Sequence, residues 1–198
     1  MDMAVRTAAV RPPSRLSTGF GVFAECLLTG VWIALAALPV VTAPAAFAAG
    51  ARHLRRHLDH ETGGWRHFAA DVRAAARGGA LVGLGGIAAV WLLWLNLSAV
   101  GAGLPGGAFV GAVGILAFIG GAVAVLRAAA VWHPGARWRD LLGAAARRTV
   151  RDPAGSLLLV GGFAVVAGSA WAVAPLAVPV TGAVAAAAVA VESRYAAR

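Results

Sequence analysis

Long runs of uncharged, mostly apolar residues constrain this chain more than any other feature of its sequence. The first run, from Leu27 to Ala49, contains no charged side chain, and about 20 helical residues are enough to cross the hydrocarbon core of a bilayer. Only 13% of the 198 residues are charged and 60% are hydrophobic, whereas a soluble domain is roughly 25% charged. The sequence therefore predicts an all-α fold, a polytopic transmembrane helical bundle.

The charged residues divide the chain into a tail, spans and loops. Residues 1–18, with three arginines and two adjacent prolines, predict a disordered basic N-terminal tail, and residues 19–198 predict a single transmembrane domain. Pro39 and Pro44 predict a kink in the first span. We expect about five spans and two cytoplasmic loops: the spans at about 27–49, 79–97, 108–126, 156–173 and 176–191, and the loops at 52–77 and 132–155.

The positions of the arginines predict which loops are cytoplasmic. Every one of the 17 basic residues is arginine; six lie in residues 52–77, six in 127–151 and two at the C-terminus, while residues 98–107 carry no charge. Basic residues gather on the cytoplasmic side of membrane spans, so the 98–107 linker is expected outside. The three arginines of the tail would also be outside in a five-span chain. A second arrangement therefore stays open, in which residues 20–50 form a bent hairpin that returns the N-terminus to the cytoplasm.

Two tryptophan-led segments predict amphipathic helices on the cytoplasmic surface. Trp65 to Arg77 and Trp138 to Arg151 each contain tryptophan, arginine, amphipathic turns and further arginine, and each precedes an apolar hairpin. This pattern predicts a weak 2+2 repeat with both copies on the same side of the lipid bilayer. We expect the rings to face the membrane and the arginines to meet anionic lipid headgroups. The predicted membrane-surface residues are Trp65, Arg66, Arg73, Trp138, Arg139 and Arg147.

Two stretches of the sequence carry a resemblance to a known family. The stretch LPVVTAPAAFAA with the basic, aromatic-bearing loop after it, and Arg151, Asp152 and Pro153 at the start of the fourth span, resemble the YesL-like family of small bacterial membrane proteins. The likeness covers about Phe20 to Val191. The family has no established biochemical activity, but its genes commonly lie beside binding-protein-dependent sugar importers and carbohydrate-degrading enzymes. The resemblance implies a multi-pass protein of a bacterial plasma membrane with an accessory role in sugar uptake.

A few side chains are candidates for chemistry. His53, His57 and His60 stand at i, i+4 and i+7, so on a continuous helix they could hold zinc, but the adjacent arginines oppose a cation and a solvated helix end has the same pattern. We expect no metal and no cofactor. Glu25 is the only acidic residue in or near an apolar span, which makes it a possible intramembrane functional residue, although a solvated carboxylate at the outer interface is the favoured interpretation. Arg127 is expected to snorkel to the inner surface.

The remaining patterns favour helix packing over catalysis. Gly79 with Gly83, and Gly107 with Gly111, predict small faces where helices pack closely in lipid. The absence of lysine excludes a Walker-type phosphate loop and a Schiff-base lysine. The serines, histidines and acids form no ordered catalytic set, so we expect no enzyme.

Charge and polarity then separate the remaining classes of function. The arginines lie between apolar spans and not along one soluble face, which argues against a nucleic-acid partner despite the net charge of +9. The spans hold few polar groups at mid-depth, where a transporter would need them. We expect an accessory or scaffolding protein that contacts the permease of an ABC-type sugar importer, and the alternative is a small-solute transporter in its own right.

Overall fold

The all-α expectation is confirmed by the computed structural model, which describes residues 15–61, 63–103 and 106–197. Its helices are α1 (Arg15–Ala36), the 3-10 helix η1 (Val40–Thr42), α2 (Ala43–Leu58), α3 (Trp65–Gly101), α4 (Gly107–Ala130), α5 (Trp138–Arg151), α6 (Pro153–Ala172) and α7 (Ala174–Ala196). Four candidate spans are long and apolar enough to cross a membrane: α3, α4, α6 and residues Ala177–Ala196 of α7. The chain is thus a polytopic helical membrane bundle.

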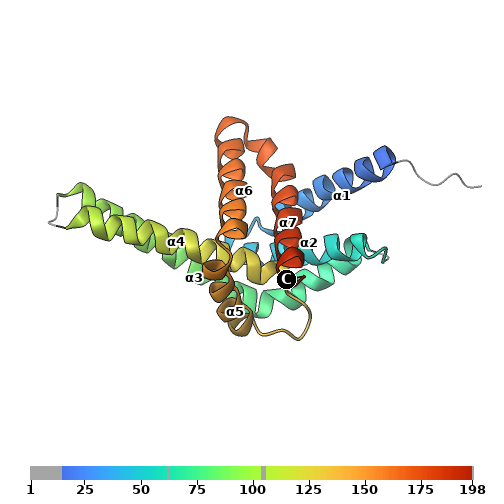
Figure 1. Cartoon of the computed structure of the whole chain (residues 1–198), viewed down its shortest axis with the longest axis horizontal. Coiled ribbons are helices and arrows are strands. Elements are labelled where there is room, and N and C mark those ends of the chain that lie inside the picture. The colour runs from blue at the N-terminus through green and yellow to red at the C-terminus, as the bar shows by residue number, and fades with distance from the viewer. Residues whose placement is uncertain (1–14, 62, 104–105, 198) are drawn as a thin grey trace, which may run out of the picture.

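The helices form two hairpins that diverge from a common base (Figure 1). The α3–α4 hairpin extends to the left of the view and the α6–α7 hairpin extends to the top, while α1 leaves toward the upper right. Between them, α2 contacts α1, α3, α4 and α7. Residues 45–51 of α2 are all buried, because five of these seven residues are alanine and one is glycine, whose small side chains let several helices approach at once.

The first predicted span, 27–49, is not one kinked helix. The chain leaves α1 after Ala36 and starts α2 at Ala43 with a proline in its first turn, a position that proline tolerates because no backbone donor is needed there. The Thr42 hydroxyl closes the turn by donating to the Ala36 carbonyl oxygen at 2.6 Å. Since α1 and α2 then pack against each other, residues 20–50 form the helical hairpin that the arginine distribution left open.

The tail and the first surface segment also differ from expectation. Residues 1–14 of the predicted disordered tail lie outside the described residues, whereas residues 15–18 already belong to α1. The predicted surface helix at 65–77 and the predicted span at 79–97 form one helix of 37 residues, α3. The second surface segment remains a separate helix, α5, because Pro153 cannot donate to the preceding turn and Asp152 adopts non-helical backbone angles.

Candidate functional site

Four charged side chains meet inside the molecule where α4, α5, α6 and α7 converge. We call them the base cluster: Arg127, Arg148, Asp152 and Glu192. Arg127 was expected to snorkel, yet it is 0% exposed. Its Nη2 lies 2.9 Å from Oδ2 of Asp152 and its Nη1 lies 3.0 Å from Oε1 of Glu192, while Nη1 of Arg148 lies 3.1 Å from the other Glu192 oxygen.

The base cluster is balanced in charge and tightly enclosed. It holds two guanidinium groups and two carboxylates, and a buried ion is tolerated only when a close partner replaces its lost hydration. Gly155 makes room for it, since an added Cβ would overlap the carboxylate of Asp152 and lie 2.6 Å from Nη2 of Arg127. The Asp152 side chain also accepts from the backbone N–H of Gly155 at 3.2 Å and so caps α6.

The cluster joins the two hairpins to each other. Arg127 comes from the inner end of α4, Glu192 from the end of α7, and Asp152 from the junction of α5 and α6. Among the described residues, Nε of Arg127 and two nitrogens of Arg148 are buried without a hydrogen-bond partner. Every carboxylate of the cluster already has an arginine partner, so the arrangement is suited to holding helices together.

A second polar contact closes the α1–α2 hairpin. Oε1 of Glu25 lies 2.5 Å from Nε2 of His53, which is only 2% exposed. The Trp32 ring covers the imidazole at a centroid distance of 5.0 Å. Glu25 is therefore not simply solvated at an outer interface, because its carboxylate binds a buried imidazole from a neighbouring helix.

The three histidines do not lie along one continuous helix, which the candidate metal site required. The helix that carries His53 and His57 ends at Leu58, and His60 lies beyond it with a left-handed φ of 58°. His53 is turned to a carboxylate on α1. Within the described ranges, no group of three or more histidine, cysteine, aspartate or glutamate side chains could hold a metal ion.

Arginines of α2 bind α3 and the loop that follows α4. Arg52 and Arg56 both contact the buried Asp71 of α3, at 2.7 and 2.8 Å. Arg55 donates from Nη2 to the carbonyl oxygen of Trp132 at 2.6 Å. Burial lowers the pKa of Arg55 below its ordinary value, and the charge of Arg52 lowers it further. These side chains are used inside the protein and are not free to meet headgroups.

The two tryptophan-led segments place their tryptophans differently. Trp65, at the start of α3, is 55% exposed, whereas Trp138, at the start of α5, is 7% exposed. The indole N–H of Trp138 donates to the Ala75 carbonyl oxygen at 3.1 Å, and its ring lies against Gly78 and Gly79. The membrane-surface role predicted for Trp138 is therefore wrong, because the ring is packed inside the protein. The predicted surface arginines Arg66, Arg73, Arg139 and Arg147 are all exposed.

The four glycines predicted for helix packing all face residues of this chain. An added Cβ at Gly79 would lie 3.0 Å from the Ala45 side chain, and one at Gly83 would overlap the Val41 carbonyl oxygen. At Gly107 and Gly111 the neighbour is Val100. These glycines therefore serve the fold of this protein and are not open to a partner.

The closest helix crossing involves two glycines that the sequence analysis did not select. Where α1 crosses α7, an added Cβ at Gly30 would lie 2.5 Å from the Val178 carbonyl oxygen, and one at Gly182 would overlap the Cys26 carbonyl oxygen. Neither glycine has another glycine four residues away, so the G-x-x-x-G pattern could not reveal them. The backbones touch there, which is how small residues stabilise helix pairs in lipid.

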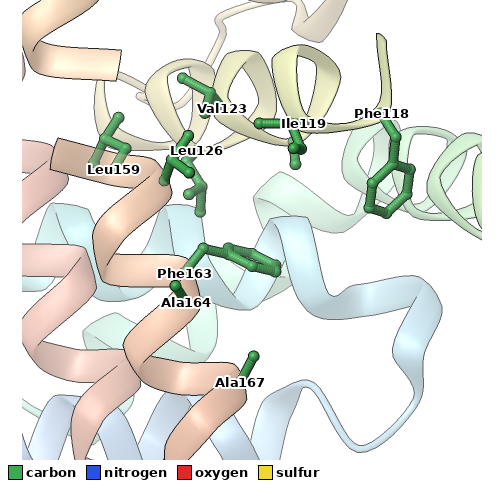
Figure 2. Close-up of a pocket in the computed structure, with 10 residues that line it drawn as sticks. Phe118, Ile119, Val123, Leu126, Leu159, Phe163, Ala164 and Ala167 are labelled. Atoms are coloured by element: carbon green, nitrogen blue, oxygen red, sulfur yellow. The ribbon is translucent and has the colours of Figure 1, made fainter. Parts of the chain in front are cut away.

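An apolar groove opens between α4 and α6 (Figure 2). It has a volume of about 200 Å³. It is lined by Phe118, Ile119, Ala122, Val123, Leu126, Leu159, Val160, Phe163, Ala164 and Ala167, and Figure 2 shows the Phe163 ring reaching from α6 toward α4. Because all ten residues are apolar, the groove offers no polar group that could orient a polar solute.

Comparisons of this chain with protein-family models, with curated proteins and with solved structures gave no match.

Proposed function

We propose that this protein is an accessory or scaffolding membrane protein that acts by contact with another membrane protein, the permease of an ABC-type sugar importer. The observation that carries the proposal is the exposure of the α3–α4 hairpin. The apolar window of α3 is only 6% buried within the chain. This hairpin projects away from the other helices (Figure 1), so both of its outer helix surfaces are available to lipid or to a partner.

Two pairs of glycines make this hairpin suited to helix packing. An added Cβ at Gly85, Gly86, Gly120 or Gly121 would meet nothing within 4 Å. Gly114 lies against Asn96, and this antiparallel register places the two glycine pairs about one helical turn apart along the hairpin. Helices in lipid associate through close packing at small residues, so these two pairs are the proposed contact with the permease.

The importer context comes from the resemblance to the YesL-like family, and the accessory role fits the base cluster. Its charges balance one another inside the chain, which is the arrangement of a structural clamp. We propose no catalytic step and no cofactor for this protein.

Co-purification and sugar uptake test the proposal in a strain that lacks the gene and carries a tagged permease. Gly86→Leu and Gly121→Leu should reduce both co-purification and uptake, because leucine at these open positions blocks close approach without disturbing the chain. Gly161→Leu on α6, where an added Cβ also meets nothing within 4 Å, is the matched control and should behave like the natural sequence. Unchanged co-purification in both hairpin variants would contradict the proposed contact.

The second candidate is a small-solute transporter, which the buried charges favour more than the sequence did. Intramembrane ionisable groups commonly mark ion and substrate paths, and both Glu192 and His53 are buried. The purified protein alone in liposomes decides between the two candidates. Solute flux that is abolished by Glu25→Gln or Glu192→Gln would contradict the accessory role and support a transporter. Liposomes without flux would support the accessory role.

A further inference from the structure

The described arginines differ in their partners. One group is held inside the chain by carboxylates or a carbonyl oxygen, and it comprises Arg52, Arg55, Arg56, Arg127 and Arg148. Among the described arginines, those that are exposed and have no ion pair include Arg147, Arg151 and Arg194, and three more lie on α3: Arg66, Arg73 and Arg77. Within the described part of the chain, these three arginines have no ion pair and no side-chain hydrogen bond. We call them the α3 strip.

The spacing of the α3 strip places its members on one face of the helix. Residues at i, i+7 and i+11 lie within about 40° of one another at 3.6 residues per turn, and they extend for about 16 Å along the axis. The opposite face is fixed, since Phe68, Asp71 and Ala75 are buried. Helix α3 therefore cannot rotate to hide the strip, and its three charges must face outward.

The strip lies where a membrane surface is expected. Arg77 is followed within two residues by the apolar part of α3, which is a candidate span. At the other end of the strip, the Trp65 ring is 55% exposed and contacts the rings of Trp32 and Phe68. On α5, by contrast, Trp138 is buried and Arg137 and Arg139 share the carboxylate of Asp140.

We infer that the α3 strip binds the headgroups of anionic glycerophospholipids in the leaflet on the base side of the membrane. This function is independent of contact with a permease. It also distinguishes the two tryptophan-led segments, because α3 meets the lipid surface while the tryptophan of α5 serves the protein interior.

Lipid selectivity of the full chain tests the inference. The protein is reconstituted in phosphatidylcholine, and spin-labelled phosphatidylglycerol is compared with spin-labelled phosphatidylcholine for the fraction immobilised at the protein surface. Each arginine near an anionic surface should change the affinity on the order of fivefold. We expect the triple change Arg66→Gln, Arg73→Gln and Arg77→Gln to reduce the preference for phosphatidylglycerol at least about tenfold, and added salt to reduce it in the natural sequence.

Two control proteins make the result specific. Changing Arg139, Arg147 and Arg151 to glutamine removes the same charge from α5 and should change the preference less than about twofold. Lysine at the three strip positions should retain the preference, which separates loss of charge from loss of folding. An equal loss from the α5 triple would overturn the assignment to α3. An unchanged preference in the α3 triple would also overturn it and leave an acidic protein surface as the partner of the strip.

Discussion

The two halves of the weak repeat begin with the same kind of segment and continue in different ways. In the first, Trp65–Arg77 runs on through Gly78 into the span without a break, and the result is the single helix α3. In the second, the segment ends at Asp152-Pro153, and α6 begins as a new helix. The break moves a carboxylate inward, so that Asp152 meets Arg127 of the other half at 2.9 Å. The dipeptide Asp152-Pro153 therefore distinguishes the second segment from the first. Its carboxylate belongs to the base cluster, which holds the two hairpins together.

Removal of Arg127, the central charge of the base cluster, should lower the free energy of unfolding most. Arg127→Met removes the arginine that pairs with Asp152 in the base cluster and one of the two arginines that pair with Glu192. Breaking a buried ion pair by removing one partner costs about 3–5 kcal/mol. Thermal and denaturant unfolding in detergent measure the loss. Arg139→Met is the control, because that side chain is 74% exposed and should change the free energy of unfolding by less than about 0.5 kcal/mol. A similar loss in both variants would show that Arg127 is not the centre of a clamp.

A single added methyl group should have the next largest effect, with opposite signs in the two halves. Gly155→Ala pushes into the carboxylate of Asp152, and such overpacking costs about 1–3 kcal/mol. Gly85→Ala on α3 meets nothing within 4 Å and should stabilise its helix by up to about 1 kcal/mol, since alanine is the better helix former. The same unfolding measurements apply. Equal signs for the two changes would contradict the close fit described around Gly155.

Substitution of the two tryptophans should lower the free energy of unfolding by different and smaller amounts. Trp138→Phe removes the N–H that donates to Ala75 at 3.1 Å and leaves a buried carbonyl without that partner, at a cost of about 1–2 kcal/mol. Trp65→Phe changes a half-exposed ring for which no hydrogen bond is found in the described chain, and the expected loss is below about 0.5 kcal/mol. A larger loss at Trp65 would mean that α3, and not α5, carries the buried anchor.

The spans were predictable because hydropathy is a local property of the sequence. The predicted segments 79–97 and 108–126 fall inside α3 and α4, 156–173 extends one residue past the end of α6, and 176–191 falls inside α7. The base cluster was not predictable in this way, since Arg127 and Glu192 are 65 residues apart and each alone resembles a charge at the end of a span. One signal was present, because both stand at the C-terminal ends of apolar runs and have opposite charges. Glu25 was counted as the only acidic residue near a span, and Glu192 was therefore overlooked.

The errors have equally specific physical causes. The first span was predicted as one kinked helix because its residues carry no charge, with a bent hairpin as the alternative. The chain folds back between α1 and α2, and these two helices pair through Glu25 and His53. Trp138 was placed on the membrane by analogy with Trp65, although the glycines of α3 that receive its ring were visible at Gly78 and Gly79. Amphipathic spacing marks which face is apolar, and it does not distinguish a lipid surface from a neighbouring helix.

The last prediction concerns topology, and its substitutions should have almost no effect on stability. If both halves have the same orientation, cysteines placed at the exposed Ala74 of α3 and Ala146 of α5 should react with a membrane-impermeant reagent from one side of the membrane only. A cysteine at Ala102, at the end of the α3 span, should react from the other side. The buried native Cys26 is first replaced by alanine.

The α1–α2 hairpin adds a further expectation to this experiment. Because Glu25 lies beside His53, the middle of α1 is near the arginines of α2, and a cysteine at the exposed Gly21, about one turn before Glu25, should react from the same side as Ala74 and Ala146. All 17 arginines of the sequence would then lie on the cytoplasmic side, in agreement with the rule that basic residues gather there. Reaction of the Gly21 position from the outside would restore the five-span arrangement and place the tail arginines outside the cell.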